Sequence, residues 1–134
     1  MAGPSFSNEE ALDTVTYDFV VDAGAIGAKD IFTAAENIII THFHATVLAA
    51  VTTSASGTVA VGVTGSLSRF MTAAQGAAAN LTLNASVVPL PVEGAPNVLA
   101  LPVFLAANNK VIQTIATGAL TAGRIKYVMK YIKA

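Results

Sequence analysis

The fold is decided by the segment Arg124-Ile-Lys-Tyr-Val-Met-Lys-Tyr-Ile132 near the end of the chain. Apolar residues alternate with basic ones along it, namely Ile125, Tyr127, Met129 and Tyr131 with Arg124, Lys126 and Lys130. A period of two residues places the two sets on opposite faces of a β-strand, one against a core and one in solvent. We therefore predict a half-buried strand over residues 124–132.

Other segments extend this pattern through most of the chain. Residues 14–22, 58–64 and 81–87 alternate in the same way and predict further strands. Residues 37–52 and 98–105 are nearly continuous apolar runs, which are typical of strands covered on both faces, and residues 111–117 complete the set. Proline cannot donate to a central ladder, so the prolines of 88–97 predict a loop and Pro102 marks an edge or a bulge.

Turn residues separate these segments and suggest how they connect. The short loops 54–57 and 107–110 lie between β-like runs and predict hairpins, hence antiparallel neighbours. Only residues 66–79 have the spacing of a short helix, with Ser66 or Ser68 as its cap and Gly76 near its end. The fold expected is all-β, an antiparallel two-sheet β-sandwich that is jelly-roll-like, with one short helix near 66–79. It forms a single domain over 13–134, preceded by an extended N-terminal arm over 1–12.

The charges are few and are sorted along the chain. Charged residues make up 11% of the sequence, against about 25% in ordinary domains, and residues 37–123 hold only Arg69, Glu93 and Lys110. A soluble monomer rarely spares so many charges, so we expect other copies or a larger partner to cover this middle segment. Acidic residues dominate 1–36, whereas the last residues carry Arg124, Lys126, Lys130 and Lys133 with no acid.

This sorting predicts a pairing between the first and last strands. If they are neighbours in one sheet, Asp18 and Asp22 would face Lys126 and Lys130, each exposed pair contributing a few tenths of a kcal/mol. Such pairs would act on register more than on stability.

Composition excludes several classes of protein. The net charge of −1 argues against non-specific binding of nucleic acid, and the lack of cysteine excludes disulfides and thiolate metal sites. The longest charge-free run contains His42, His44 and many Ser and Thr residues, so it does not predict a membrane-spanning helix. The first ten residues lack a basic leader and an apolar core, so we expect no secretory signal and folding in a cytoplasm.

Candidate chemistry is sparse. His42 and His44 share one face of a strand at a spacing compatible with metal ligation, but no third ligand stands nearby, and packing or subunit contact is the favoured interpretation. The sequence contains no phosphate-binding loop, nucleophile elbow or His–carboxylate cluster. We therefore expect no enzyme activity, no cofactor and no metal.

The apolar run 98–105 has two interpretations, core strand or interface strand. The surrounding scarcity of charge favours the interface, because an exposed apolar strand is otherwise an aggregation hazard. In the N-terminal arm, Pro4 and Phe6 provide a rigid and an apolar anchor for docking, although a merely disordered terminus is the alternative. The predicted interface residues are Pro4, Phe6, His42, His44, Leu99, Leu101, Val103 and Leu105.

Three segments, Val47–Gly65, Ser66–Met71 and Ala116–Tyr131, resemble parts of small virion proteins of tailed bacteriophages. Those proteins are similar in having a Val-rich strand ending in Thr-Thr, a glycine hairpin, a Val-Gly strand, a short helical segment and a glycine-led last strand rich in Tyr and Lys. The nearest likeness is to capsid decoration, or cement, proteins. The resemblance implies a β-sandwich that sits on the capsid exterior, commonly as trimers, and holds neighbouring shell subunits together without catalytic residues.

Composition and resemblance together predict a structural virion protein that binds the major capsid protein on the outside of a phage capsid. We expect a homotrimer that gains affinity by multivalency and binds neither nucleic acid nor membrane. The alternative is a head-fibre or tail-associated module that recognises a glycan or a receptor. A glycan site should expose aromatic side chains, and the chain has no Trp and only three Tyr residues, which weakens that alternative.

Overall fold

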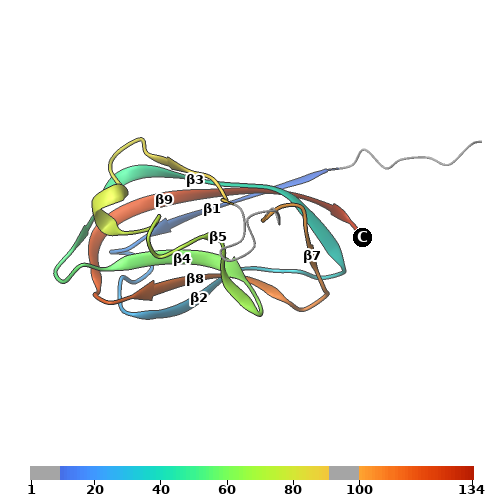
Figure 1. The fold of residues 1–134 in the computed structure, drawn as a ribbon, viewed down its shortest axis with the longest axis horizontal. Helices are drawn as coiled ribbons and strands as arrows, with labels where there is room; N and C mark the ends of the chain where they lie inside the picture. Colours follow the sequence, from blue (N-terminus) through green and yellow to red (C-terminus); the bar gives the residue numbers. More distant parts are fainter. Residues whose placement is uncertain (1–9, 91–99) are drawn as a thin grey trace, which may run out of the picture.

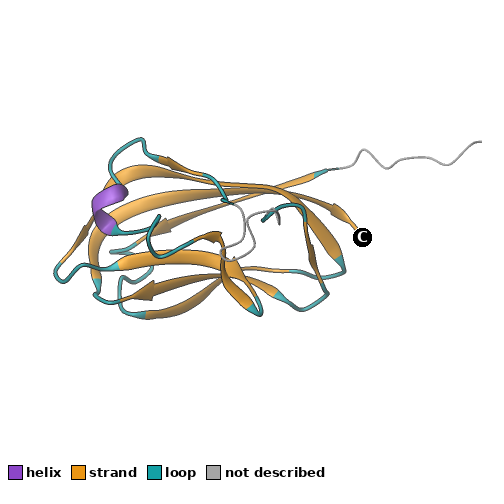
Figure 2. Cartoon of the chain, viewed as in Figure 1, coloured by secondary structure: helices purple, strands orange, loops and turns teal. Residues whose placement is uncertain are grey.

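A computed structural model of the chain describes residues 10–90 and 100–134 as a β-sandwich (Figure 1). Its strands are β1 (Ala11–Asp18), β2 (Gly27–Thr33), β3 (Ile38–Thr53), β4 (Thr58–Val63), β5 (Ser66–Met71), β6 (Ser86–Val87), β7 (Val103–Leu105), β8 (Lys110–Ala116) and β9 (Leu120–Lys133). One 3₁₀ turn, η1, covers Ala78–Asn80 (Figure 2). No helix in the described part of the chain is long and apolar enough to span a membrane.

The strands form two antiparallel sheets with the topology of a jelly roll. The first sheet has the order β1-β9-β3-β6, with β7 also paired to β3, and the second has the order β2-β8-β4-β5. Pairs β3·β6 and β3·β7 are both antiparallel and follow each other along β3, so β6 and β7 are the two halves of one interrupted edge strand. Counted in this way, the chain forms the two Greek keys of an eight-stranded jelly roll. The predicted fold class is confirmed.

The register of the first sheet confirms that the first and last strands are neighbours. Strand β1 pairs with β9 from Ala11 opposite Tyr131 to Asp18 opposite Arg124, and β9 pairs on its other side with β3. Strand β1 thus begins at Ala11, inside the segment predicted as an arm, while residues 1–9 lie outside the described part of the chain.

The predicted helix over 66–79 is wrong. Residues 66–71 form β5 and pair with β4, and both Phe70 and Met71 are buried. The following segment turns through reciprocal bonds in which the Gln75 side chain accepts from the Thr72 amide and the Thr72 hydroxyl accepts from the Gln75 amide. Gly76 then lies so close to β4 that a Cβ would sit 1.7 Å from the carbonyl oxygen of Val59. Pairing with β4 therefore overrides the local helical spacing.

The two predicted hairpins are also wrong, although the loops are where they were expected. The loop 54–57 carries the chain from β3 in the first sheet to β4 in the second, and the loop 107–110 carries it from β7 to β8 between the same two sheets. A short glycine-containing loop suits a crossing between packed sheets as well as a hairpin, so loop chemistry alone could not separate the two.

Other strand predictions were partly correct. The predicted strand 81–87 shrinks to Ser86–Val87, although the Val47 and Val51 amides still bond to this segment. Strand β2 was not predicted, because it contains Gly27, Lys29 and Asp30. Strand β3 is not covered on both faces, since its burial alternates along the strand. Pro102 precedes the short edge strand β7, in agreement with its predicted place.

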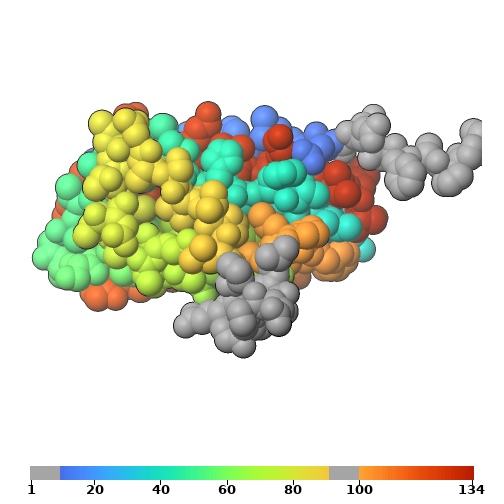
Figure 3. All heavy atoms as spheres, turned by 45° about the horizontal axis from the view of Figure 1, so that its top comes forward, coloured from blue at the N-terminus to red at the C-terminus, as the bar shows by residue number. Residues whose placement is uncertain are grey.

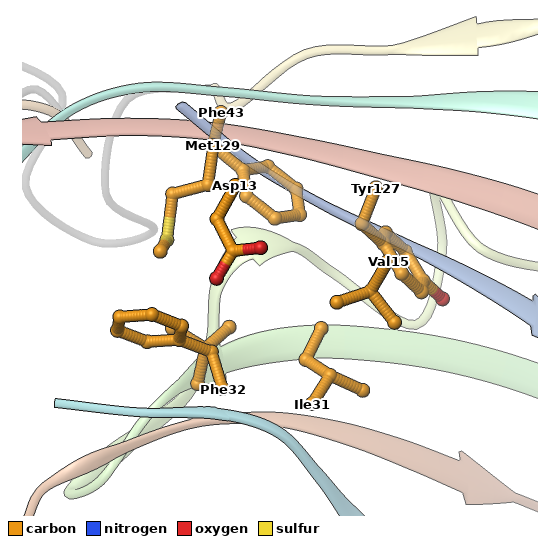
Figure 4. A pocket seen from close by; sticks show the side chains of 8 residues that line it. Asp13, Val15, Ile31, Phe32, Phe43, Tyr127 and Met129 are labelled. Carbon is orange, nitrogen blue, oxygen red and sulfur yellow. The ribbon is translucent and has the colours of Figure 1, made fainter. Parts of the chain in front are cut away.

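The core fills the space between the sheets. Phe43 of β3 stacks on Phe70 of β5 with ring centroids 4.6 Å apart, and the valines of β4 point inward from the second sheet. A small void of about 10 Å³ remains near the β1/β2 edge, where the Asp13 carboxylate points inward among Phe43, Phe32 and Met129 (Figure 4). Its other lining residues are Val15, Ile31, Val111 and Tyr127.

Candidate interaction surface

The outer face of the first sheet gathers the basic residues of the chain's last strand. Arg124, Lys126 and Lys130 alternate with buried neighbours on β9, so all three side chains are exposed on the side away from the core. On the adjacent strand β3, His42 and His44 are exposed on the same side. We call these five residues the basic face.

Strand pairing fixes the positions of these side chains. Lys130 lies between Leu12 of β1 and His42 of β3. Lys126 likewise lies between Thr16 of β1 and Thr46 of β3. The register of β3 against β9 shifts between Ile40 and His42, which adds one residue to β3 at Thr41. Because of this bulge, Ile40 and Phe43 both point into the core while His42 and His44 both point outward.

One carboxylate lies at the end of the basic face. Glu10 is 3.8 Å from Lys130 Nζ and 3.9 Å from His42 Nδ1, and its Oε2 accepts a hydrogen bond of 3.1 Å from Thr41 Oγ1. The contact with His42 is an ion pair only when the imidazole is protonated. These groups are exposed, so each pair contributes little to stability. Glu10 therefore orders this end of the sheet without cancelling the charge of the other cations.

The predicted pairing of Asp18 and Asp22 with Lys126 and Lys130 is wrong. Asp18 is the register partner of Arg124, and Asp22 lies beyond the end of β1 in the loop to β2. The prediction assumed a strand running to residue 22. The chain instead turns after Asp18, because the two carboxylates bond to backbone amides of the turn.

These amide bonds make the β1–β2 loop a compact turn. Asp18 Oδ1 accepts from the amides of Val20 (2.8 Å) and Val21 (3.1 Å), and Asp22 Oδ2 accepts from the Asp18 amide (2.9 Å). The amides of Val20 and Val21, with a smaller contribution from Arg124, hold the pKa of the Asp18 carboxyl below its usual value. Asp18 thus acts chiefly within its own loop.

The metal interpretation of His42 and His44 gains no support from their surroundings. Within residues 10–90 and 100–134, no group of three or more His, Asp or Glu side chains is arranged to hold a metal ion. Both rings lie on the open face of the sheet, where they are available to a partner.

The other predicted interface residues are placed differently. Leu105 is only 2% exposed and belongs to the core, and Leu101 and Val103 pack against that core. Pro4, Phe6 and Leu99 lie outside the described residues. The interface role of this set stays a prediction.

Phe104 was missed, although it is the outward side chain of β7 and is 57% exposed. Strict alternation applied to 103–105 would have found it, because its two neighbours point inward. The exposed side chains of Val20 and Val21 were also missed, since a strand was expected there.

The second sheet carries a shallow hollow on its outer face. Ala60 of β4 and Thr114 of β8 line it on one side, and Leu67 of β5, the turn at 72–74 and Leu90 line it on the other. Its volume is about 620 Å³, and no charged side chain is among its lining residues. The Thr114 hydroxyl is buried there without a hydrogen-bond partner among the described residues.

Comparison with known proteins identifies the fold. No family model matches the sequence, and no curated protein matches it. A chain of the solved structure "Cyanophage Pam1 capsid asymmetric unit" has a similar structure, with a TM-score of 0.64 and 15% sequence identity. The match covers 100% of this chain and 93% of that chain. The match therefore shows a likeness of fold over the full length of this chain.

Proposed function

We propose that this chain is a structural virion protein of a tailed bacteriophage, which binds the outside of the capsid as a decoration, or cement, protein and has no catalytic role. The observation that carries the proposal is the jelly roll shared over the full length of the chain with a chain of a phage capsid structure. Jelly rolls serve many functions, capsid and lectin domains among them. The distribution of charge and of exposed apolar residues therefore supplies the rest of the argument.

The basic face is the surface that we assign to the capsid. It presents Arg124, Lys126 and Lys130 together on one broad sheet, where these cations outnumber the neighbouring carboxylates of Glu10 and Asp18. The partner of such a face is an acidic protein surface, here that of the major capsid protein. Each exposed pair contributes little, but an oligomer that engages several shell subunits at once gains affinity by multivalency.

Co-sedimentation with empty phage heads tests the proposal. We expect the purified protein to pellet with heads that lack a decoration protein, and less of it to pellet as salt rises, because salt screens exposed charges. Lys126→Glu should weaken binding at least about tenfold, the effect of roughly 1.4 kcal/mol. Lys29→Glu is the matched control, because it makes the same change at an exposed lysine of the second sheet. Equal loss in both variants would contradict the assignment of the basic face.

The alternative function has a distinct outcome in the same assay. A head-fibre or tail-associated module should bind host cells or purified surface polysaccharide and should stay in the supernatant when the heads are pelleted. Binding of that kind would replace the decoration proposal.

A further inference from the structure

The exposed apolar side chains gather at the two open edges of the sandwich. Of the ten large hydrophobic residues that are exposed in the described part of the chain, only Leu48 lies on an inner strand, on the outer face of β3. Four lie at the side formed by β1, β2 and the loop between them, with Leu12 near the start of β1 and Val20, Val21 and Ile26 on the loop. Five lie at the opposite edge, formed by β5, β6 and β7, namely Leu67, Leu83, Val88, Leu90 and Phe104.

Both edges are built from both sheets. At the first edge, Val15 of β1 and Ile31 of β2 line the same interior void. At the second edge, Arg69 Nε of β5 donates to the Ala100 carbonyl oxygen (3.0 Å), and Gln75 Nε2 donates to that of Val88 (3.1 Å). Figure 3 shows the yellow segment near residues 80–90 beside the orange segment that contains β7, so this edge is a continuous surface.

The first edge presents its valines in a fixed conformation. Val20 and Val21 are 67% and 80% exposed, yet their amides are bonded to Asp18. The Tyr17 hydroxyl donates to the carbonyl oxygen of Ala23 (2.9 Å), which ties the same loop to the core. Exposed apolar groups held in one conformation lose little entropy on binding, which is the property of a binding anchor.

The second edge offers a surface that also exposes apolar side chains and carries little charge among its described residues. The hollow on the second sheet opens beside it, with Leu67 and Leu90 in its lining. Natural proteins usually blunt sheet edges with charged residues. Among the described residues of β5, β6 and β7, Arg69 is the only charged one, and it is half-buried.

We propose that the β1/β2 edge of one copy packs against the β5/β6/β7 edge of a second copy. The two edges lie on opposite sides of the sandwich, so a single chain cannot join its own. Charge favours a contact between two different edges over a symmetric contact between two copies of the first edge. Asp18 and Asp22 lie beside Val20 and Val21 and would repel their counterparts in a symmetric contact, whereas they meet no carboxylate among the described residues of the second edge.

The contact is made by side chains and does not extend a sheet. Asp13 points inward from the edge strand β1, which is a device that opposes strand addition. Strands β6 and β7 have two and three residues, too few for a long ladder. Head-to-tail contacts of this kind close into a ring when the rotation allows it.

The length of the edge predicts a weak contact. Strand β1 has eight residues and is therefore about 27 Å long, which offers less area than the roughly 800 Å² per partner of a standard interface. We expect association to appear only at high protein concentration, up to about 1 mM. This inference deepens the self-association in the proposed function, and its test uses no capsid, so its failure would leave capsid binding untouched.

Sedimentation velocity on the full chain tests the contact. The sedimentation coefficient of the wild type should rise with concentration, whereas Val21→Asp and Phe104→Asp should each remain monomeric. The matched control Leu48→Asp introduces the same charge on a sheet face and should associate like the wild type. Circular dichroism verifies folding, and Val20→Asp and Leu90→Asp replace any variant that does not fold.

Mixing the two variants gives the decisive result. Val21→Asp keeps an intact second edge and Phe104→Asp keeps an intact first edge, so an equimolar mixture should form a heterodimer that neither variant forms alone. Self-association of either variant, no species larger than a monomer in the mixture, or a wild type that is monomeric throughout would each overturn the proposal. Loss of association in Leu48→Asp would overturn it as well.

Discussion

The Tyr127 hydroxyl donates a hydrogen bond to the side-chain oxygen of Gln113 inside the core. Tyr127 belongs to β9 in the first sheet and Gln113 to β8 in the second, so this bond links the two layers of the sandwich. Gln113 is 0% exposed and is the one buried polar residue of the described core. Burial raises the pKa of Tyr127, which keeps its hydroxyl protonated as the donor.

Tyr127→Phe should lower the free energy of unfolding by about 1–3 kcal/mol, because it leaves a buried oxygen of Gln113 without a partner. Adding Gln113→Leu should recover most of that loss, since two apolar groups of similar shape need no hydrogen bond. Urea unfolding of both single variants and the double variant measures the coupling. Tyr131→Phe is the control, as its hydroxyl bonds to none of the described residues. Additive effects of the two substitutions would contradict the predicted coupling.

Asp13→Leu should stabilise the protein by about 1 kcal/mol, because the new side chain fills apolar space now occupied by a carboxylate. Thr14→Leu is the matched control, since residue 14 points to solvent and should change stability by less than about 0.5 kcal/mol. Thermal unfolding measures both. A lower melting temperature for Asp13→Leu would mean that the carboxylate has a stabilising role in the edge.

Asp18 makes the β1–β2 loop sensitive to acid. Its carboxyl has a pKa below the ordinary value of 3.8 in the folded state, chiefly because the amides of Val20 and Val21 bond to it. A lowered folded pKa stabilises the protein above the unfolded pKa, and this stabilisation is lost as the pH falls through the folded value. Asp18→Asn should therefore melt below the wild type at pH 7, and the difference should shrink as the pH falls below 3.8. A difference in melting temperature that does not change with pH would contradict this account.

Gly24→Ala should destabilise the chain by more than about 2 kcal/mol. A Cβ at residue 24 would lie 1.9 Å from the Leu120 carbonyl oxygen. The backbone would have to move to relieve this clash. Gly65→Ala is the control, because a Cβ there has open space and meets only the strain of φ +86°, a cost of about 1 kcal/mol. Chemical unfolding ranks the two, and an equal loss would argue against the close packing of the loop on Leu120.

Sequence reasoning found the elements whose burial is set by local alternation. Strand β9 was predicted over residues 124–132, although it begins four residues earlier, at Leu120. Its pairing with β1 followed from the sorting of charges, although the pairs that form are not the predicted ones. The carboxylate of Asp18 was expected to reach a lysine across the sheet, but amides two and three residues away were nearer. Aspartate side chains in turns commonly accept hydrogen bonds from backbone amides a few residues further along the chain.

The remaining misses come from long-range packing. The spacing of Leu67, Phe70 and Met71 fits a helix, and only the presence of β4 beside them makes a strand. The exposed side chain of Phe104 and the gathering of apolar residues at two edges depend on which strands end each sheet. No local pattern contains that information.

The antiparallel pairing of β1 and β9 has a practical consequence for grafting. Ala11 is opposite Tyr131, so the chain enters the first strand and leaves the last one at the same end of the molecule (Figure 1). The loop that displays Val20 and Val21 follows the other end of β1. Peptides attached before Ala11 and after Lys133 would therefore emerge side by side, so the sandwich is suited to carry a matched pair of labels or antigens.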